Sequence, residues 1–107
     1  MKLDKDSSLS KIQTGALKLY GKYDVDKSLV WMAEEFGEVV SAIHKRHSKE
    51  CIQEELGDLL AWIFCLGNIF DIELIEAMKQ TMEKEIRRQM KEYGKLKYSN
   101  EELEWDE

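Results

Sequence analysis

The chain has 107 residues, of which 36% are charged and 43% hydrophobic, the balance of one soluble globular domain rather than of a disordered chain. Proline is absent and there are only six glycines, so the usual signals of strands and tight turns are missing and an all-α fold is predicted. The net charge of −6 is spread along the chain, which argues against a nucleic-acid polymer as partner. A single nucleotide stays possible, because a bound cation can reverse the local sign.

The sequence shows no membrane or export signal. The longest nearly apolar stretch, residues 59–70, is too short to cross a bilayer, and residues 1–10 are too polar for a signal peptide. Cys51 and Cys65 lie fourteen positions apart on one predicted helix, about 21 Å, so they cannot form a disulfide with each other. We expect a cytoplasmic protein without a membrane partner.

The first two predicted helices occupy the first 44 residues or so. The first covers about residues 8–20 and ends at Gly21. The second begins after Asp26, a candidate N-cap. Its apolar positions repeat with helical spacing: Leu29, Ala33, Phe36, Val40 and Ile43.

Two further helices complete the prediction. The third covers about residues 48–70, and the fourth follows Asp71, a second candidate N-cap, and ends at Tyr93 before Gly94. The expected result is a fold like a four-helix bundle.

The chain is expected to be one domain, residues 1–107, with a core of about 8–94 and a polar tail, 95–107. Within the third helix, Asn68 is the only polar residue of the stretch 59–70, so the apolar surface there runs almost all the way round. Such a helix must be covered on every side, and three companion helices are too few. We therefore expect a homo-oligomer, either a dimer or a tetramer.

Two acidic pairs occupy equivalent positions on the second and third helices. Glu35 and Glu38 precede the polar segment 44–49 by the same distance at which Glu55 and Asp58 follow it. If the helices form an antiparallel hairpin at that segment, all four carboxylates converge at one height.

A converging set of carboxylates repels itself unless a cation binds. Oxygen ligands without histidine favour Mg²⁺, with Mn²⁺ as the alternative, over zinc. The alternative interpretation is an ordinary solvated acidic face, which is less favoured for two pairs at matched height than for a single glutamate.

The acidic pairs also form a longer motif. Glu-Glu-Phe-Gly-Glu at 34–38 is followed by Glu-Leu-Gly-Asp at 55–58, and then by the segments 66–68 and 71–77. This pattern resembles the MazG-like nucleotide pyrophosphohydrolases over about residues 28–90. The resemblance implies an oligomeric all-α enzyme that uses Mg²⁺ to split nucleoside triphosphates into a monophosphate and pyrophosphate.

The resemblance also implies roles for individual residues. Glu34 would accept the proton of the attacking water, and Glu54 is a less favoured candidate that would lie close to the ion or the substrate. Lys84 and Arg88 would contact the triphosphate. The metal ligands would be Glu35, Glu38, Glu55 and Asp58, of which Glu38 would also belong to the catalytic set.

The positions of Lys84 and Arg88 support this reading, since two like charges one turn apart are unfavourable unless an anion lies between them. A plain solvated face among neighbouring charges is the alternative. The chain departs from the family pattern at two positions. Asp71 stands where glycine is frequent, and Glu85 stands where asparagine is frequent.

Two tryptophans are candidates for stacking on a nucleobase. Trp62 lies one turn beyond Asp58, and Trp31 shares a stripe with Glu35. Aromatic residues at helical spacing are more often core, so both have that alternative.

Other functions stay open at this stage. A phosphoribosyl-ATP pyrophosphohydrolase shares the fold and the acidic pattern, and a non-catalytic helical oligomer or nucleotide sensor is the rival outside the enzymes. Intact acids at all four ligand positions speak against a silent protein. A ferritin-like di-iron protein is a poorer alternative still, since the inward Glu-x-x-His pairs that it needs are missing.

Overall fold

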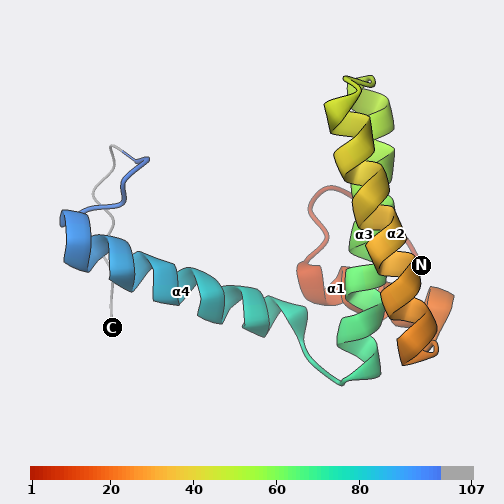
Figure 1. Cartoon of the computed structure of the whole chain (residues 1–107). Helices are drawn as coiled ribbons and strands as arrows, with labels where there is room; N and C mark the ends of the chain where they lie inside the picture. Colours follow the sequence, from red (N-terminus) through yellow and green to blue (C-terminus); the bar gives the residue numbers. More distant parts are fainter. Residues whose placement is uncertain (100–107) are drawn as a thin grey trace. The chain divides into compact units, whose positions relative to one another are not determined.

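The computed structural model describes residues 1–99 and shows four α-helices and no strand among them (Figure 1). The predicted all-α fold is confirmed. The described chain forms two compact units, with the boundary after Leu74. Residues 100–107, most of the predicted tail, lie outside the described residues. The helices are α1 (Leu9–Tyr20), α2 (Val25–His44), α3 (Lys49–Ile69) and α4 (Leu74–Tyr93).

Hydroxyl and carboxylate side chains begin the first three helices. Ser8 caps α1 and Ser48 caps α3, each accepting a hydrogen bond from the backbone N–H three residues on. The cap of α2 is Asp24, whose Oδ1 accepts from the N–H of Lys27 at 2.8 Å. The prediction of Asp26 was therefore wrong: Asp26 already lies in the first helical turn, where its charge favours the positive end of the helix dipole.

The turn of the hairpin is a Schellman motif that ends α2. Arg46 has the left-handed φ of 56°, and its N–H donates to the carbonyl of Ile43 at 3.1 Å. The N–H of His47 reaches back to the carbonyl of Ala42 at 2.9 Å. These two bonds satisfy carbonyls that the helix end leaves free, so α2 stops there and the chain reverses into α3.

A second Schellman motif ends α3 and corrects the role predicted for Asp71. Asp71 has a φ of 53° and donates to Asn68, while the N–H of Ile72 donates to the carbonyl of Gly67 at 2.8 Å. Asp71 thus closes α3 and does not cap α4. The left-handed conformation is the reason glycine suits this position, and a short acidic side chain tolerates it better than most.

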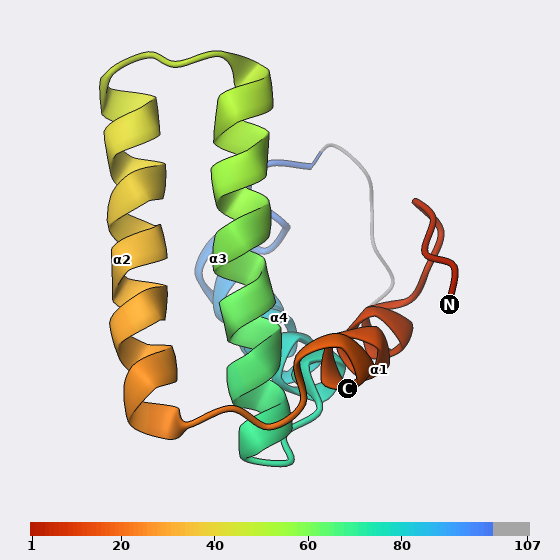
Figure 2. The same ribbon diagram turned by 90° about the vertical axis from the view of Figure 1, so that its right-hand side faces the viewer.

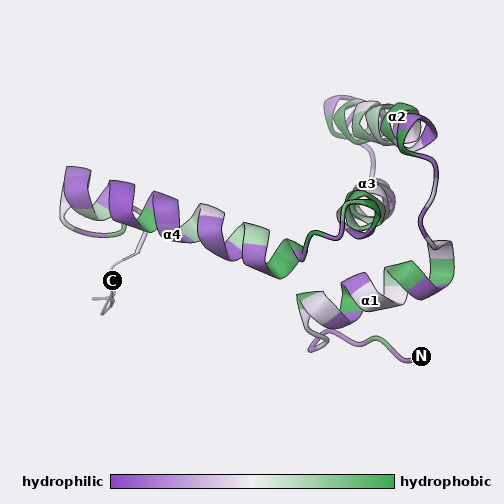
Figure 3. Cartoon of the chain, turned by 90° about the horizontal axis from the view of Figure 1, so that it is seen from below, coloured by the Kyte–Doolittle hydropathy of each residue, from purple (hydrophilic) through white to green (hydrophobic). Residues whose placement is uncertain are grey.

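Within the first unit, α3 lies between α1 and α2 (Figures 2 and 3). The helices α2 and α3 run antiparallel, side by side, as the predicted hairpin, and α1 packs against the C-terminal half of α3 (Figure 2). The buried apolar residues are few and mostly small: Ala16, Val39, Ala42, Phe64 and Cys65.

A buried amide network fixes α1 against the end of α3. The Gln13 side chain donates to Asn68 Oδ1 at 3.1 Å and to the carbonyl of Ile72 at 2.7 Å, and it accepts from the N–H of Leu74 at 2.9 Å. Asn68 Nδ2 returns a bond to the carbonyl of Gln13 at 3.1 Å. Gly67 leaves room for this network, because a Cβ there would lie 2.9 Å from Leu74 Cγ. Asn68, the single polar residue of the apolar stretch 59–70, therefore has a structural role: its hydrogen bonds hold α1 against the end of α3.

Among the described residues, several large apolar side chains of the hairpin are exposed. On α2, Phe36, Val40 and Ile43 are more than half exposed, and on α3 Leu60 is half exposed. The expected apolar stripe of the second helix is thus exposed rather than core, since among residues 1–99 α2 packs chiefly on α3. We call Leu29, Phe36, Val40, Ile43, Leu56, Leu60 and Ile63 the apolar face of the hairpin.

The second unit is α4 with the segment that follows it. Gly94 has a φ of 71° and its N–H donates to the carbonyl of Met90 at 3.0 Å, which ends the helix where the sequence predicted. The chain then folds back so that the N–H of Lys97 donates to Gln89 Oε1 at 3.0 Å. Among residues 1–99, no helix combines the length and apolarity needed to span a membrane.

Candidate metal centre

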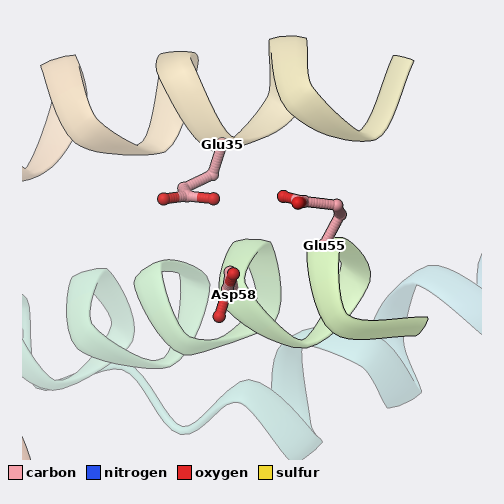
Figure 4. Close-up of side chains that lie close together, drawn as sticks. All are labelled: Glu35, Glu55 and Asp58. Atoms are coloured by element: carbon pink, nitrogen blue, oxygen red, sulfur yellow. The ribbon is translucent and has the colours of Figure 1, made fainter. Parts of the chain in front are cut away.

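The facing sides of α2 and α3 carry a tight group of acids. Carboxylate oxygens of Glu35, Glu55 and Asp58 all lie within 4.8 Å of one another. Glu35 comes from α2 and points toward α3, while Glu55 and Asp58 come from successive turns of α3 (Figure 4). We call these three residues the acidic cluster.

The cluster forms because the turn sets the register of the hairpin. The Schellman motif at Arg46 lies midway between the acids of the two helices, so Glu35 meets the level of Asp58 and Glu38 meets that of Glu55. The two acids of each helix, Glu35 and Glu38 on α2 and Glu55 and Asp58 on α3, are three residues apart. Each pair therefore lies on one side of its helix. A one-residue change in the turn would rotate one helix by about 100° against the other.

Mutual repulsion and burial perturb both glutamates of the cluster. The pKa of Glu35 is raised above its ordinary value of 4.5, first by burial and then by the neighbouring Glu38. The pKa of Glu55 is raised chiefly by hydrogen bonding to the Glu38 carboxyl, with burial second. Asp58 raises the pKa of both further by its charge. These carboxyls hold protons more tightly than isolated ones because burial and the neighbouring carboxyls disfavour their charged form.

Two oxygens of the cluster are buried without a partner. Among the described residues, Glu35 Oε2 and Glu55 Oε2 are shielded from solvent and accept no hydrogen bond. Buried polar atoms in folded proteins nearly always have a partner, and leaving a carboxylate oxygen without one is unfavourable. A hard divalent cation satisfies both oxygens and removes the repulsion, so the donor set fits such an ion.

The other predicted acids lie around this cluster. Glu38 is solvent-exposed and close enough to raise the pKa of Glu35 and of Glu55, both of which are half-buried, so it borders the cluster. Glu54 is exposed and raises the pKa of Glu55 by its charge. Glu34 is exposed on α2 beside Glu35, and no contact of its side chain ties it to the cluster.

A pocket of about 560 Å³ adjoins the cluster, and two of the acids, Glu35 and Asp58, contribute to its wall. Trp62 lines it as well, whereas Trp31 is 46% exposed and is not part of the lining. The rest of the wall is Leu19, Tyr20, Tyr23, Ala61 and Cys65. Of the two predicted stacking residues, the structure therefore brings only Trp62 beside the acids.

Lys84 and Arg88 belong to α4, in the second unit, and both are exposed. Arg88 is held by two carboxylates of its own helix: it donates to Glu85 at 2.6–3.1 Å and to Glu92 at 2.6 Å. The Arg88 guanidinium in turn lowers the pKa of Glu85 to about 2, with help from Gln89. Contact of Lys84 and Arg88 with a triphosphate stays a prediction.

Sequence reasoning missed the contribution of the first helix and the connection after it. Leu19, Tyr20 and Tyr23 form one wall of the pocket, and Tyr23 lies against Trp62 with ring centroids 6.1 Å apart. No local pattern marks these residues, although two tyrosines flanking Gly21 just before an acidic helix are an aromatic grouping that can line a site.

Acids from two antiparallel helices thus lie beside an aromatic pocket in an all-α fold, and their oxygens form a donor set that suits a divalent cation. A family model described as the MazG nucleotide pyrophosphohydrolase domain matches residues 24–92. The chain belongs to this family and is therefore a nucleotide pyrophosphohydrolase, a hydrolase. The match spans both acidic pairs and continues through nearly all of α4. A comparison with curated proteins found no match.

Proposed function

We propose that this protein is a Mg²⁺-dependent nucleoside triphosphate pyrophosphohydrolase. It converts NTP or dNTP and water into NMP or dNMP and pyrophosphate, and so removes unwanted nucleotides from the cellular pool. The observation that supports this most is the pair of buried oxygens on Glu35 and Glu55 that have no partner among the described residues, in a cluster that adjoins a pocket of about 560 Å³. An acidic protein with this cluster binds a polyphosphate only when a cation lies between the two.

The residues proposed to hold the ion are Glu35, Glu38, Glu55 and Asp58, with Mn²⁺ as an alternative to Mg²⁺. When bound, the ion neutralises phosphate charge and lowers the pKa of a coordinated water. Glu35 and Glu55 supply the shielded oxygens, and the exposed Glu38 closes the set from the solvent side.

Proton transfer and charge stabilisation are assigned to residues around the ligands. The Glu34 carboxylate accepts the proton of the attacking water, and Glu38 belongs to the same catalytic set. Glu54, one residue before a ligand, lies on the substrate side. Lys84 and Arg88 offset the charge of the departing pyrophosphate. Before it can contact the pyrophosphate, Arg88 must break hydrogen bonds that it now donates to Glu85 and Glu92.

The protein is further proposed to be a homo-oligomer, a dimer or a tetramer. The apolar face of the hairpin supports this proposal, because large exposed apolar side chains gathered on two neighbouring helices are typical of an interface. Phe36→Glu and Leu60→Glu should each reduce the molar mass measured by light scattering to that of the 12.6 kDa protomer. Met78→Glu, an equally exposed change on α4, is the control.

Residues 1–107 are proposed to form one functional domain, since the family match at 24–92 crosses the boundary between the two units. A cytoplasmic location is proposed from the two free cysteines, which suit a reducing compartment.

The test is a panel of nucleoside triphosphates with Mg²⁺, scored separately for pyrophosphate and for phosphate. The panel includes phosphoribosyl-ATP, whose exclusive hydrolysis would identify the related activity instead. Glu38→Ala and Asp58→Ala should abolish turnover in a helical, folded protein. Glu50→Ala is the matched control, an exposed acid on the first turn of α3 away from the cluster, and it should keep full activity.

Release of phosphate instead of pyrophosphate would refute the assigned bond, and turnover by Asp58→Ala would refute the assigned ligands. Metal binding has a readout of its own. Mg²⁺ at a hundred times its dissociation constant should stabilise the wild type by about 2.7 kcal/mol, and this gain should disappear in Asp58→Ala.

A further inference from the structure

The lining of the pocket beside the acidic cluster is aromatic as well as acidic. Besides Glu35 and Asp58, its lining contains three aromatic residues, Tyr20, Tyr23 and Trp62. A volume of about 560 Å³ is in the range of small-molecule sites. If the acids and their ion take the phosphates, as the proposed function requires, the aromatic wall lies within reach of the nucleobase.

The rings of Tyr23 and Trp62 form a tilted pair, with centroids 6.1 Å apart and planes at 56°. A flat base stacked between two rings needs about 3.5 Å on each side, or about 7 Å between parallel rings. The pair is therefore about 1 Å and one ring rotation short of admitting a base. Only one partner is free to make that adjustment.

Trp62 is in the middle of α3, half-buried, and its backbone is held by helical hydrogen bonds. Tyr23 lies in the four-residue connection between α1 and α2, and 43% of its surface is exposed. The connection begins at Gly21, whose φ of 66° suits glycine. The Tyr23 ring can therefore move together with its connection without disturbing a helix, whereas the backbone of Trp62 is held in place by α3.

We propose that Tyr23 and Trp62 are an aromatic clamp for the nucleobase, in which Trp62 is the fixed platform and Tyr23 swings to close over the base. This inference rests on the proposed function and adds how the substrate is selected. Among the described residues, the pocket lining contains no amide side chain, so the clamp reads the face of a base and not its hydrogen-bonding edge. The enzyme therefore accepts several bases and favours purines, which offer the larger stacking surface.

Binding of uncleaved analogues tests the clamp without relying on turnover. The probes are α,β-methylene-ATP, α,β-methylene-CTP and inorganic tripolyphosphate, each with Mg²⁺ in a titration calorimeter. Tyr23→Leu should weaken binding of α,β-methylene-ATP about tenfold, which is about 1.4 kcal/mol, and should bring the adenine and cytosine analogues closer in affinity. Binding of tripolyphosphate should stay unchanged, because it has no base to stack.

Two further variants are controls: one keeps the aromatic ring at position 23, and the other removes a tyrosine outside the pocket. Tyr23→Phe keeps the stacking surface and should bind all three probes like the wild type. Tyr98→Leu removes a tyrosine that is 90% exposed and outside the pocket, and it should change nothing.

The clamp is overturned if Tyr23→Leu binds α,β-methylene-ATP as tightly as the wild type does. It is overturned as well if the affinity of Tyr23→Leu for tripolyphosphate falls as much as its affinity for α,β-methylene-ATP, because Tyr23 would then have a structural role. It is also overturned if the wild type binds the adenine analogue no better than tripolyphosphate. Failure of the proposed function is a different result: the wild type would then release no pyrophosphate from any nucleotide, whatever its binding preferences.

Discussion

Removing the Asn68 side chain should loosen α1 without disturbing the metal centre. Asn68→Ala deletes two hydrogen bonds to Gln13, each 3.1 Å long, at a position that is 8% exposed. Two net hydrogen bonds are worth about 2 kcal/mol, and the small cavity adds up to about 1 kcal/mol. For a unit that ends at Leu74, a loss of about 2–3 kcal/mol lowers the unfolding temperature by roughly 8–24 °C.

Thermal unfolding followed by far-ultraviolet circular dichroism measures this loss. The control is Thr14→Ala, an exposed residue next to Gln13 on α1, which should unfold within about 0.5 kcal/mol of the wild type. Asn68 follows Asp58 by ten residues, about 15 Å along α3, so the stabilisation by Mg²⁺ should persist in Asn68→Ala. Equal unfolding temperatures for the two variants would show that the amide network does not hold α1 in place.

Three shorter predictions address the acids, α4 and the packing at Gly67. Because the glutamates of the acidic cluster have pKa values raised above 4.5, they favour folding below that value and lose this contribution as the pH rises through the raised pKa. In urea titrations without metal, the free energy of unfolding of the wild type should therefore rise relative to that of Glu35→Gln as the pH falls. A difference between the two free energies that does not change with pH would contradict the raised pKa. Glu85→Gln frees Arg88 and should tighten tripolyphosphate binding roughly two- to fivefold by calorimetry, whereas unchanged or weaker binding argues against a phosphate contact. Gly67→Ala places a Cβ 2.9 Å from Leu74 and should cost about 1–3 kcal/mol in thermal unfolding, while an equal effect of Gly57→Ala, in open space, would rule out this packing.

Local sequence predicted the helices well because their ends carry their own signals. Ser8 and Ser48 cap helices as their residue type suggests, and Gly94 stops α4 in a left-handed conformation. The wrong predictions concern the aspartates that were expected to cap helices, Asp26 and Asp71. Asp24 and Asp26 have the same capping chemistry, and only the backbone geometry decides which one accepts the first free N–H. Asp71 resembles a cap but serves as the left-handed residue of a Schellman motif.

The acidic cluster was predictable because it depends on two periodicities and one turn. Acids three residues apart share a helix side, and equal distances from the turn place Glu35 level with Asp58. The pocket was not predictable in the same way. Tyr23 reaches Trp62 through the packing of α1 on α3, a contact across 39 positions that leaves no periodic trace in the sequence.

What the sequence by itself determined is the all-α fold, the family and the acids that face one another, since each follows from side-chain chemistry repeated at helical spacing. Only the tertiary structure decided three features of the described residues: Glu35 and Glu55 each bury an oxygen without a partner, an aromatic pair lies in the pocket beside the acidic cluster, and the apolar face of the hairpin is exposed. Burial and exposure depend on which helices cover each other. That choice comes from the free energy of packing distant segments together, which no local pattern encodes.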